Sequence, residues 1–223
     1  MMIELTAIRK AYGKKEILTD VSFVAKEGSC VGILGGNGCG KTTLLSILAG
    51  VRRADGGAFL YNGRNLLTET VLRNSVLGYV PQGDPLMEEL TAWDNLRLWH
   101  DKATLRRELS GGVLAMLGID EFLKVPVCKM SGGMKKRLSI GCVVAARPKI
   151  LLLDEPSAAL DIICRELIYN YFEAYKADGG ILLLATHDMQ ELELCSQSYI
   201  LKQGKLTSYT YDGDIHRLAE SLQ

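Results

Sequence analysis

The sequence predicts an α/β fold whose core is a mainly parallel sheet, and two features carry this prediction. Residues 150–153 and 181–185 are continuous apolar runs, which are typical of strands covered by helices on both faces. The stretch 160–174 between them has helical spacing, so strand, helix and strand follow one another. Such alternation favours parallel strands, because the connecting helix carries the chain back across the sheet.

The remaining elements are predicted from periodicity and turn signals. Residues 29–34 predict a small buried strand, and residues 42–48 continue as a helix with an apolar face. Residues 91 to about 123 have helical spacing, opened by Thr91 as an N-cap. Short runs with turn signals around them predict further strands at 3–8, 16–25 and 58–61, a strand pair within 197–211, and a terminal helix at 215–222.

Composition places the chain among globular proteins and excludes several other classes. Lys+Arg and Asp+Glu both number 26, so the chain lacks the basic excess of proteins that coat nucleic acid. No apolar stretch approaches the roughly 20 residues that a membrane helix needs, and no signal peptide is expected at the N-terminus. The six cysteines have no metal-ligand spacing, which favours buried thiols in a reducing cytosol.

A phosphate-binding loop follows the strand at residues 29–34. Residues 35–42 (Gly-Gly-Asn-Gly-Cys-Gly-Lys-Thr) fit the pattern G-x-x-x-x-G-K-[ST] at every fixed position. The glycines allow backbone N–H groups to turn toward phosphate oxygens, and the following helix adds the positive end of its dipole. Lys41 is expected to reach the β- and γ-phosphates and Thr42 to ligate Mg²⁺. A glycine-rich surface turn is the alternative, and the flanking strand and helix disfavour it.

Two carboxylates end the apolar run at 150–153. A buried strand would deliver Asp154 to the edge of the sheet, where it can hold Mg²⁺ through water. Glu155 would then polarise the attacking water or take its proton. The alternative is an ordinary solvated acidic turn, which the nearby phosphate loop disfavours.

With these motifs the chain resembles the ATP-binding cassette (ABC) ATPases over nearly its whole length. That family carries a signature of the form L-S-G-G-Q, and residues 109–113 and 130–134 are both candidates. In the family the signature serine lies about two dozen residues before the metal-binding aspartate. Ser131 precedes that aspartate by 23 residues and Ser110 by 44. The apolar spacing from 105 to 117 also predicts a continuous helix through the first segment, so we predict the second as the signature.

The resemblance implies a P-loop NTPase core with an N-terminal antiparallel β subdomain (residues 1–82 and 145–223) and an inserted α-helical subdomain with the signature (83–144). It implies that the chain binds ATP and Mg²⁺ and hydrolyses ATP. Catalytic roles fall to Lys41, Gln82, Glu155 and His187. Contacts with the nucleotide fall to Tyr12, Gly35, Gly36, Asn37, Gly38, Cys39, Gly40, Lys41, Thr42, Thr43, Ser131, Gly132 and Gly133. Contacts with the metal fall to Thr42, Gln82 and Asp154.

The resemblance also assigns more specific roles. Tyr12 is expected to stack on adenine, and Gln82 to sense Mg²⁺ while its flanks touch a transport partner. His187 is expected to contact the γ-phosphate. Residues 157–161 match the loop that crosses the interface between two cassettes.

The chain departs from the family at three positions. Gly36 and Ile162 replace frequent prolines, which we expect to be small changes. Met134 replaces the signature glutamine, and the loss of a polar contact there is expected to weaken the site shared by two cassettes.

For two further groups of residues we predict structural roles. Lys135, Lys136 and Arg137 are predicted to form a solvated helix face. Trp93 and Trp99 are predicted to pack the helical subdomain, with contact to a partner protein as the alternative.

In this family two cassettes close head to tail around two ATP molecules, so a second ABC cassette, identical or different, is the implied partner. Membrane-spanning permease subunits are the second implied partner, and no nucleic acid is expected. The chain would then be cytoplasmic and peripheral on the inner face of the cell membrane. Residues 89–96 resemble cassettes of exporter-type systems. The alternatives are a soluble ABC ATPase, for example of cluster-assembly type, and a weakly hydrolysing regulatory half of a heterodimer.

Overall fold

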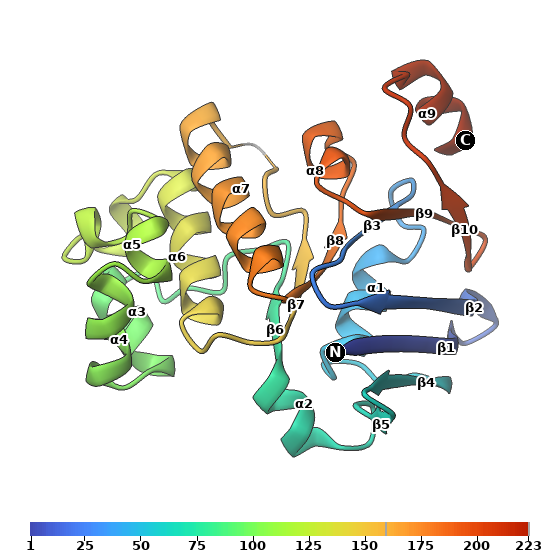
Figure 1. Ribbon diagram of the computed structural model, residues 1–223, viewed down its shortest axis with the longest axis horizontal. Coiled ribbons are helices and arrows are strands. Elements are labelled where there is room, and N and C mark those ends of the chain that lie inside the picture. The colour runs from blue at the N-terminus through green and yellow to red at the C-terminus, as the bar shows by residue number, and fades with distance from the viewer. Residues whose placement is uncertain (159, 223) are drawn as a thin grey trace.

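The predicted parallel strands lie within a ten-stranded sheet, in the order β5-β4-β1-β2-β10-β9-β3-β8-β7-β6 (Figure 1). The computed structural model describes residues 1–158 and 160–222. The strands are β1 (Met2–Tyr12), β2 (Lys15–Lys26), β3 (Cys30–Leu34), β4 (Gly56–Tyr61), β5 (Arg64–Asn65), β6 (Leu77–Val80), β7 (Ile150–Asp154), β8 (Ile181–Ala185), β9 (Gln197–Lys202) and β10 (Lys205–Tyr209). The longer helices are α1 (Lys41–Leu48), α2 (Thr70–Val76), α3 (Ala92–Trp99), α4 (Lys102–Leu109), α6 (Gly132–Val144), α7 (Ile162–Ala177) and α9 (Ile215–Leu222). The short ones are α5 (Val113–Met116), α8 (Met189–Glu193) and the 3₁₀ turns Asp120–Phe122 and Val127–Lys129.

The core of the sheet is parallel and covered on both faces. β3 pairs in parallel with β8 and β9, and β7 pairs in parallel with β6 and β8. Every residue of β7 and β8 is buried. Leu151 and Leu153 belong to one hydrophobic cluster, whereas Ile150 and Leu152 belong to the cluster that contains α1. Alternate side chains therefore pack on opposite layers of helix, and the predicted α/β class with a mainly parallel core is confirmed.

The N-terminal strands are antiparallel, as the family resemblance implies. β1 pairs with both β2 and β4, and β4 pairs with β5. The hairpin between β1 and β2 turns at Gly13, whose φ of 60° suits a residue without a side chain. These strands occupy the opposite end of the molecule from α3, α4 and α5 (Figure 1).

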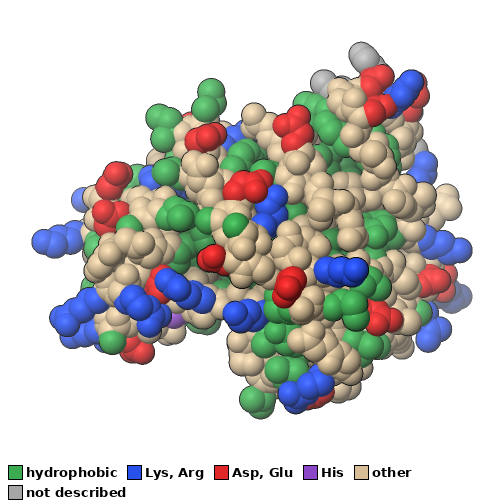
Figure 2. Space-filling view, in the orientation of Figure 1, with side chains coloured by type: hydrophobic (Ala, Val, Ile, Leu, Met, Phe, Trp, Pro, Cys, Tyr) green, Lys and Arg blue, Asp and Glu red, His purple; other side chains and the backbone are tan. Residues whose placement is uncertain are grey.

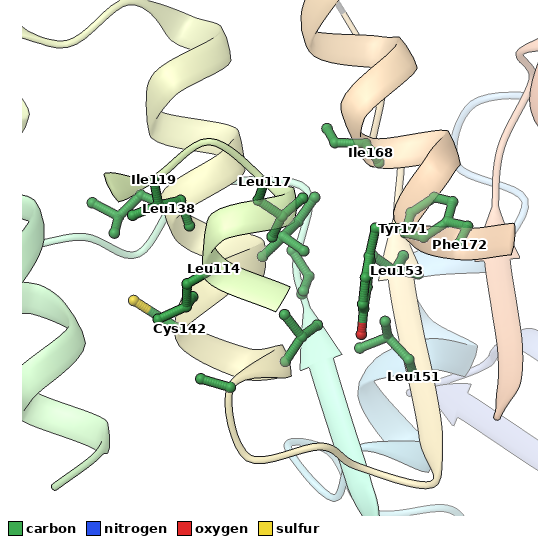
Figure 3. Close-up of a cluster of buried hydrophobic side chains, with 14 of the residues drawn as sticks. Leu114, Leu117, Ile119, Leu138, Cys142, Leu151, Leu153, Ile168, Tyr171 and Phe172 are labelled. Carbon is green, nitrogen blue, oxygen red and sulfur yellow. The ribbon is translucent and has the colours of Figure 1, made fainter. Parts of the chain in front are cut away.

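Helices α3 to α6, which we call the helical subdomain, share their core with the sheet. Leu114, Leu117 and Leu138 lie in the same cluster as Leu153 of β7 and Phe172 of α7 (Figure 3). The helical subdomain is thus anchored through α6 and α7 on one face of the parallel strands.

Two predictions about this region are wrong or incomplete, and two elements before it were missed. The continuous helix expected from 105 to 117 is interrupted, because α4 ends at Leu109 and Gly111 adopts a left-handed φ of 108° before α5 begins. The strand β6 and the helix α2 before it were not predicted. Trp93 packs against the core as expected, whereas Trp99 is 69% exposed.

One end of the molecule is rich in basic side chains, although the formal net charge of the chain is zero. Lys and Arg side chains gather over α3 and α4, at the left of Figure 2, whereas both signs are mixed elsewhere on that face. The basic side chains of these two helices are Arg97, Lys102, Arg106 and Arg107. Within residues 1–158 and 160–222, no helix combines the length and the apolar character needed to cross a bilayer.

Candidate functional site

The phosphate loop connects the buried strand β3 to α1 and curls around the Lys41 side chain. Lys41 is 6% exposed, and its Nζ donates a hydrogen bond to the Gly35 carbonyl at 2.6 Å. Gly38 and Gly40 have φ values of 77° and 116°, which only glycine adopts without strain. The loop therefore holds a cation at the start of a helix, where backbone N–H groups and the helix dipole also favour an anion.

A cleft of about 480 Å³ opens at this loop and brings together residues from five parts of the chain. The lining residues predicted from sequence are Asn37, Gly38, Cys39, Gly40, Lys41, Thr42, Thr43, Gln82, Glu155 and His187. Ile17 of β2 also lines the cleft and was not predicted. Strands β3, β6, β7 and β8 end at this edge of the sheet, which is where parallel sheets place ligand sites.

Asp154 ends β7 as a buried acid close to Thr42 and Lys41. It is 1% exposed, and among the described residues neither of its carboxylate oxygens has a hydrogen-bond partner at bonding distance. Burial raises the pKa of Asp154, and the nearby Thr42 hydroxyl and Lys41 ammonium offset only part of that rise. An unsatisfied carboxylate beside a threonine hydroxyl fits Mg²⁺, which takes oxygen ligands at protein sites.

Thr42 and Asp154 have the oxygen donors that Mg²⁺ prefers. No cluster of three His, Cys, Asp or Glu side chains occurs among the described residues. Mg²⁺ usually keeps water and substrate phosphates beside one or two protein groups. Thr42 and Asp154 are the side chains that would hold it here, with Gln82 at the same cleft.

The Glu155 carboxylate contacts two other predicted residues, Gln82 and His187. Its Oε2 accepts a hydrogen bond from Gln82 Nε2 at 2.9 Å, and its Oε1 lies 3.5 Å from His187 Nε2. The backbone of Glu155 has a φ of 51°, and its N–H donates to the Ala185 carbonyl at the end of β8. This left-handed turn is unfavourable for a glutamate, and the contact with β8 stabilises it so that the carboxylate points into the cleft.

Tyr12 is not among the residues that line this cleft. Its ring is 43% exposed at the end of β1 and is contacted by two cations, Lys10 Nζ at 5.4 Å and Arg52 Cζ at 5.8 Å from the ring centre. Arg52 also donates a hydrogen bond to the Tyr12 hydroxyl at 3.0 Å. The predicted stacking on adenine therefore remains a prediction.

Ser131, Gly132 and Gly133 lie away from the cleft. Ser131 caps α6, accepting a hydrogen bond from the Met134 N–H at 3.2 Å. A side chain at Gly133 would overlap Cys164 of α7, whereas Gly132 faces open space. Within one chain the predicted signature does not reach the phosphate loop.

The prediction of a solvated basic face at 135–137 is wrong for two of its three residues. Lys136 is 5% exposed, and its Nζ contacts the Gln82 carbonyl at 3.2 Å and Asp84 at 3.0 Å. Arg137 is buried against the Phe122 ring and donates to the Leu117 carbonyl at 3.0 Å. Long cationic side chains bury their stems when their charged ends find oxygen partners. Lys136 thereby ties α6 to the segment that carries Gln82.

Glu191 of α8 is a site-supporting residue that the sequence reasoning missed. It is fully buried, and its Oε1 accepts a hydrogen bond from the Ser157 N–H at 3.1 Å. This bond joins α8, which follows His187, to the segment that follows Glu155. Burial raises the pKa of Glu191 to about 6, with a further increase from Asp188, although groups of Ser157 and Thr186 oppose the rise. A carboxylate four residues after the predicted histidine, Thr-His-Asp-Met-Gln-Glu, was the available signal.

Glu191→Gln is expected to change the pH dependence of stability. A carboxyl whose pKa is raised on folding stabilises fully below its unfolded pKa and loses that contribution as the pH rises through its folded pKa. From well below pH 4.5 to well above pH 6, the wild-type free energy of unfolding should fall by about 2 kcal/mol relative to the variant. Urea unfolding across this range measures the difference, with the exposed Glu193→Gln as the matched control. Parallel curves for all three proteins would contradict the assignment.

Known proteins are similar to this chain over most of its length. Residues 18–158 match the family model described as "ABC transporter". The Nod factor export ATP-binding protein I of Sinorhizobium fredii (strain NBRC 101917 / NGR234) is 36% identical over 91% of this chain and 61% of its own length. The linearmycin resistance ATP-binding protein LnrL of Bacillus subtilis (strain 168) is 34% identical over 92% of this chain and 68% of its own length. The chain thus spans about two thirds of these relatives.

Solved structures agree in fold. An ATP-binding subunit of an ABC transporter has a TM-score of 0.84 and 28% identity, and the match covers 100% of this chain and 95% of that one. A dimeric ATP-binding cassette in a post-hydrolysis state, bound to ADP and Pi, has a TM-score of 0.83 and 26% identity, with coverage of 95% and 100%.

Proposed function

Because the chain belongs to the ABC transporter family, we propose that it is the ATP-binding and ATP-hydrolysing subunit of an export-type membrane transporter. The observation that carries the proposal is the single cleft in which Lys41, Glu155, Gln82 and His187 meet. They arrive from the ends of different parallel strands. Chance grouping of these residue types beside a phosphate loop is a weak rival explanation.

The loop side of the cleft is proposed to bind the phosphates. Backbone N–H groups of residues 36–42 and the start of α1 favour phosphate oxygens, and the buried Lys41 ammonium adds a full charge. Mg²⁺ held by Thr42 and Asp154 would neutralise charge on the β- and γ-phosphates. Thr43 lies at the same end of α1 and lines the cleft.

The opposite side is proposed to position and deprotonate water. Glu155 supplies the carboxylate, which accepts the proton of the attacking water. Gln82 and His187 contact the two oxygens of that carboxylate and thereby fix its orientation. Lys136 contacts the backbone of Gln82, so movement of the helical subdomain is coupled to this group.

The position of the signature supports action as a pair of cassettes. Ser131 and Gly132 are exposed, and Ile162 and Ile163 nearby are 84% and 74% exposed at the start of α7. Two large apolar side chains beside the signature favour coverage by another protein surface. A second cassette placed head to tail would bring the signature of each chain to the phosphate loop of the other. Met134 packs partly against the core, so its apolar side chain is accommodated within α6.

Export and membrane coupling are supported by the relatives and by a second cleft. The relatives' names describe Nod factor export and linearmycin resistance. A cleft of about 460 Å³ lies between β6, α6 and the end of α3, next to the segment that carries Gln82. Its lining includes Pro81, Pro85, Leu86 and the exposed Trp99. We assign this surface to a membrane-spanning partner, in keeping with the alternative role considered for Trp99.

Purification of the tagged chain from native membranes tests the assignment. We expect a polytopic membrane protein to accompany the wild-type chain and to be largely lost with Trp99→Ala, because exposed aromatic anchors dominate interface energies. Leu98→Ala is the matched control, since Leu98 is 55% exposed on the same helix and does not line the cleft. Recovery of soluble partners only would support the cluster-assembly alternative and contradict the transporter assignment.

A further inference from the structure

The thiols of Cys30 and Cys195 form a close pair outside the proposed nucleotide site. Their Sγ atoms are 3.4 Å apart, although 165 residues separate them in the chain. Cys30 begins β3 and is fully buried, whereas Cys195 follows α8 and is partly exposed. No role in nucleotide binding or hydrolysis accounts for this pair.

The backbone fixes this approach. The Ser196 N–H donates to the Cys30 carbonyl at 2.9 Å, and the Cys30 N–H donates to Ser196 Oγ at 3.2 Å. Gly32, two residues along β3, leaves room for the second sulfur, because a side-chain carbon there would lie 2.9 Å from Cys195 Sγ. The two segments are thus held in register with both sulfurs on one face of β3.

Cys195 is the more accessible of the two cysteines. Cys195 lines a surface cleft of about 400 Å³ formed with β9 and the residues after β10. Cys30 is enclosed, and the bond with Cys195 and burial both raise the pKa of its thiol, so it remains protonated. Cys195 is therefore the thiol that meets the reagent, and Cys30 is the one that completes the reaction.

We propose that Cys30 and Cys195 are a disulfide-forming modification site that responds to peroxide. The Cys195 thiolate attacks one peroxide oxygen, the O–O bond breaks, and the departing hydroxide takes a proton to leave as water. The Cys30 sulfur then attacks the sulfenic sulfur, and the S–O bond breaks. The hydroxide takes the Cys30 proton and leaves as a second water. Two thiols are oxidised and one peroxide is reduced.

The bond has a consequence for the proposed ATPase, and this step rests on the proposed function. The sulfurs must approach from 3.4 Å to about 2.05 Å. β3 is held between β8 and β9, so the segment after α8 is the part that moves. α8 carries Glu191, which holds the Ser157 N–H, and it follows His187. Oxidation is therefore expected to lower ATP turnover several-fold, reversibly with dithiothreitol.

Mapping of thiols after peroxide treatment tests the pair. The full chain is oxidised, its remaining thiols are alkylated, and a non-reducing digest is analysed by mass spectrometry. A peptide that links Cys30 to Cys195 and disappears on reduction is expected. Cys195→Ser should abolish it, whereas Cys128→Ser, at an exposed cysteine, should retain it. If Cys30 and Cys195 are still recovered as alkylated thiols at a peroxide dose that oxidises Cys128, the proposal is overturned.

The expected effect of the disulfide on ATP turnover is measured separately. Peroxide should slow hydrolysis by the wild-type chain and not by Cys195→Ser. Equal inhibition of both would overturn the link to turnover. A chain that forms the disulfide but never hydrolyses ATP would contradict the proposed function and leave the modification site established.

Discussion

Replacing Glu155 by Gln is expected to lower ATP turnover by about 10²- to 10⁴-fold, because the variant loses a general base. The substitution keeps the size of the side chain and an oxygen that can accept from Gln82 Nε2, which lies 2.9 Å from the carboxylate. It removes the group that takes a proton. Binding of Mg·ATP should stay close to that of the wild-type chain, since Lys41 and the phosphate loop are untouched.

The same variant should accumulate as an ATP-dependent pair of cassettes. Under the proposed function hydrolysis ends the closed state, so a slow enzyme retains it. Solution mass with and without Mg·ATP measures this, and Lys41→Ala is the binding-deficient control. A monomer with ATP bound would favour a different cassette as the partner, as in the heterodimer alternative. Glu166→Gln, at an exposed glutamate of α7, is the matched control for turnover. If Glu155→Gln and Glu166→Gln both hydrolyse at the wild-type rate, Glu155 is not the base.

The parallel core and the cleft could be predicted because their signals are local. The runs at 150–153 and 181–185 are apolar at every position, which identifies strands buried on both faces. The carboxyl ends of such strands share one edge of the sheet. Residues that follow these two strands can therefore meet, and the structure places Glu155 3.5 Å from His187.

What could not be predicted depends on contacts between distant segments. β6 is a four-residue strand with Gly78 in it, and only its pairing with β7 distinguishes it from a loop. Lys136 is buried because the Gln82 carbonyl and Asp84 lie opposite it, more than fifty residues earlier in the chain. A charged residue on a helix is otherwise read as exposed.

The break between α4 and α5 follows the same rule. Apolar spacing from 105 to 117 predicts a helix, although two glycines lie within it. Gly111 instead takes a left-handed conformation, and Glu108 bonds to Arg147 through both carboxylate oxygens beneath the turn. Tertiary contacts with the end of α6 thus outweighed local periodicity.

Asp154→Asn is expected to stabilise the nucleotide-free protein while abolishing most of its turnover. Burial raises the pKa of Asp154, so this group stabilises fully below its ordinary pKa of 3.8 and loses that contribution as the pH rises. At neutral pH the ionised carboxylate is buried without a hydrogen-bond partner among the described residues. A neutral amide should raise the free energy of unfolding by about 1–3 kcal/mol. Turnover should fall by at least about 10²-fold, because a metal ion contributes several kcal/mol to such reactions.

Thermal unfolding with and without Mg·ATP separates these two effects. The variant should melt above the wild-type chain when both are free of nucleotide, and it should gain less on addition of Mg·ATP, because ligand stabilisation scales with affinity. Asp120→Asn, at an exposed position, should change neither value. A variant that melts at a lower temperature in the absence of nucleotide would contradict this prediction. It would show that the attraction between the Asp154 carboxylate and the Lys41 ammonium stabilises the fold more than burial of the charge destabilises it. The expected opposite signs identify Asp154 as a residue kept for binding at the expense of stability, as strained or unsatisfied groups at functional sites commonly are.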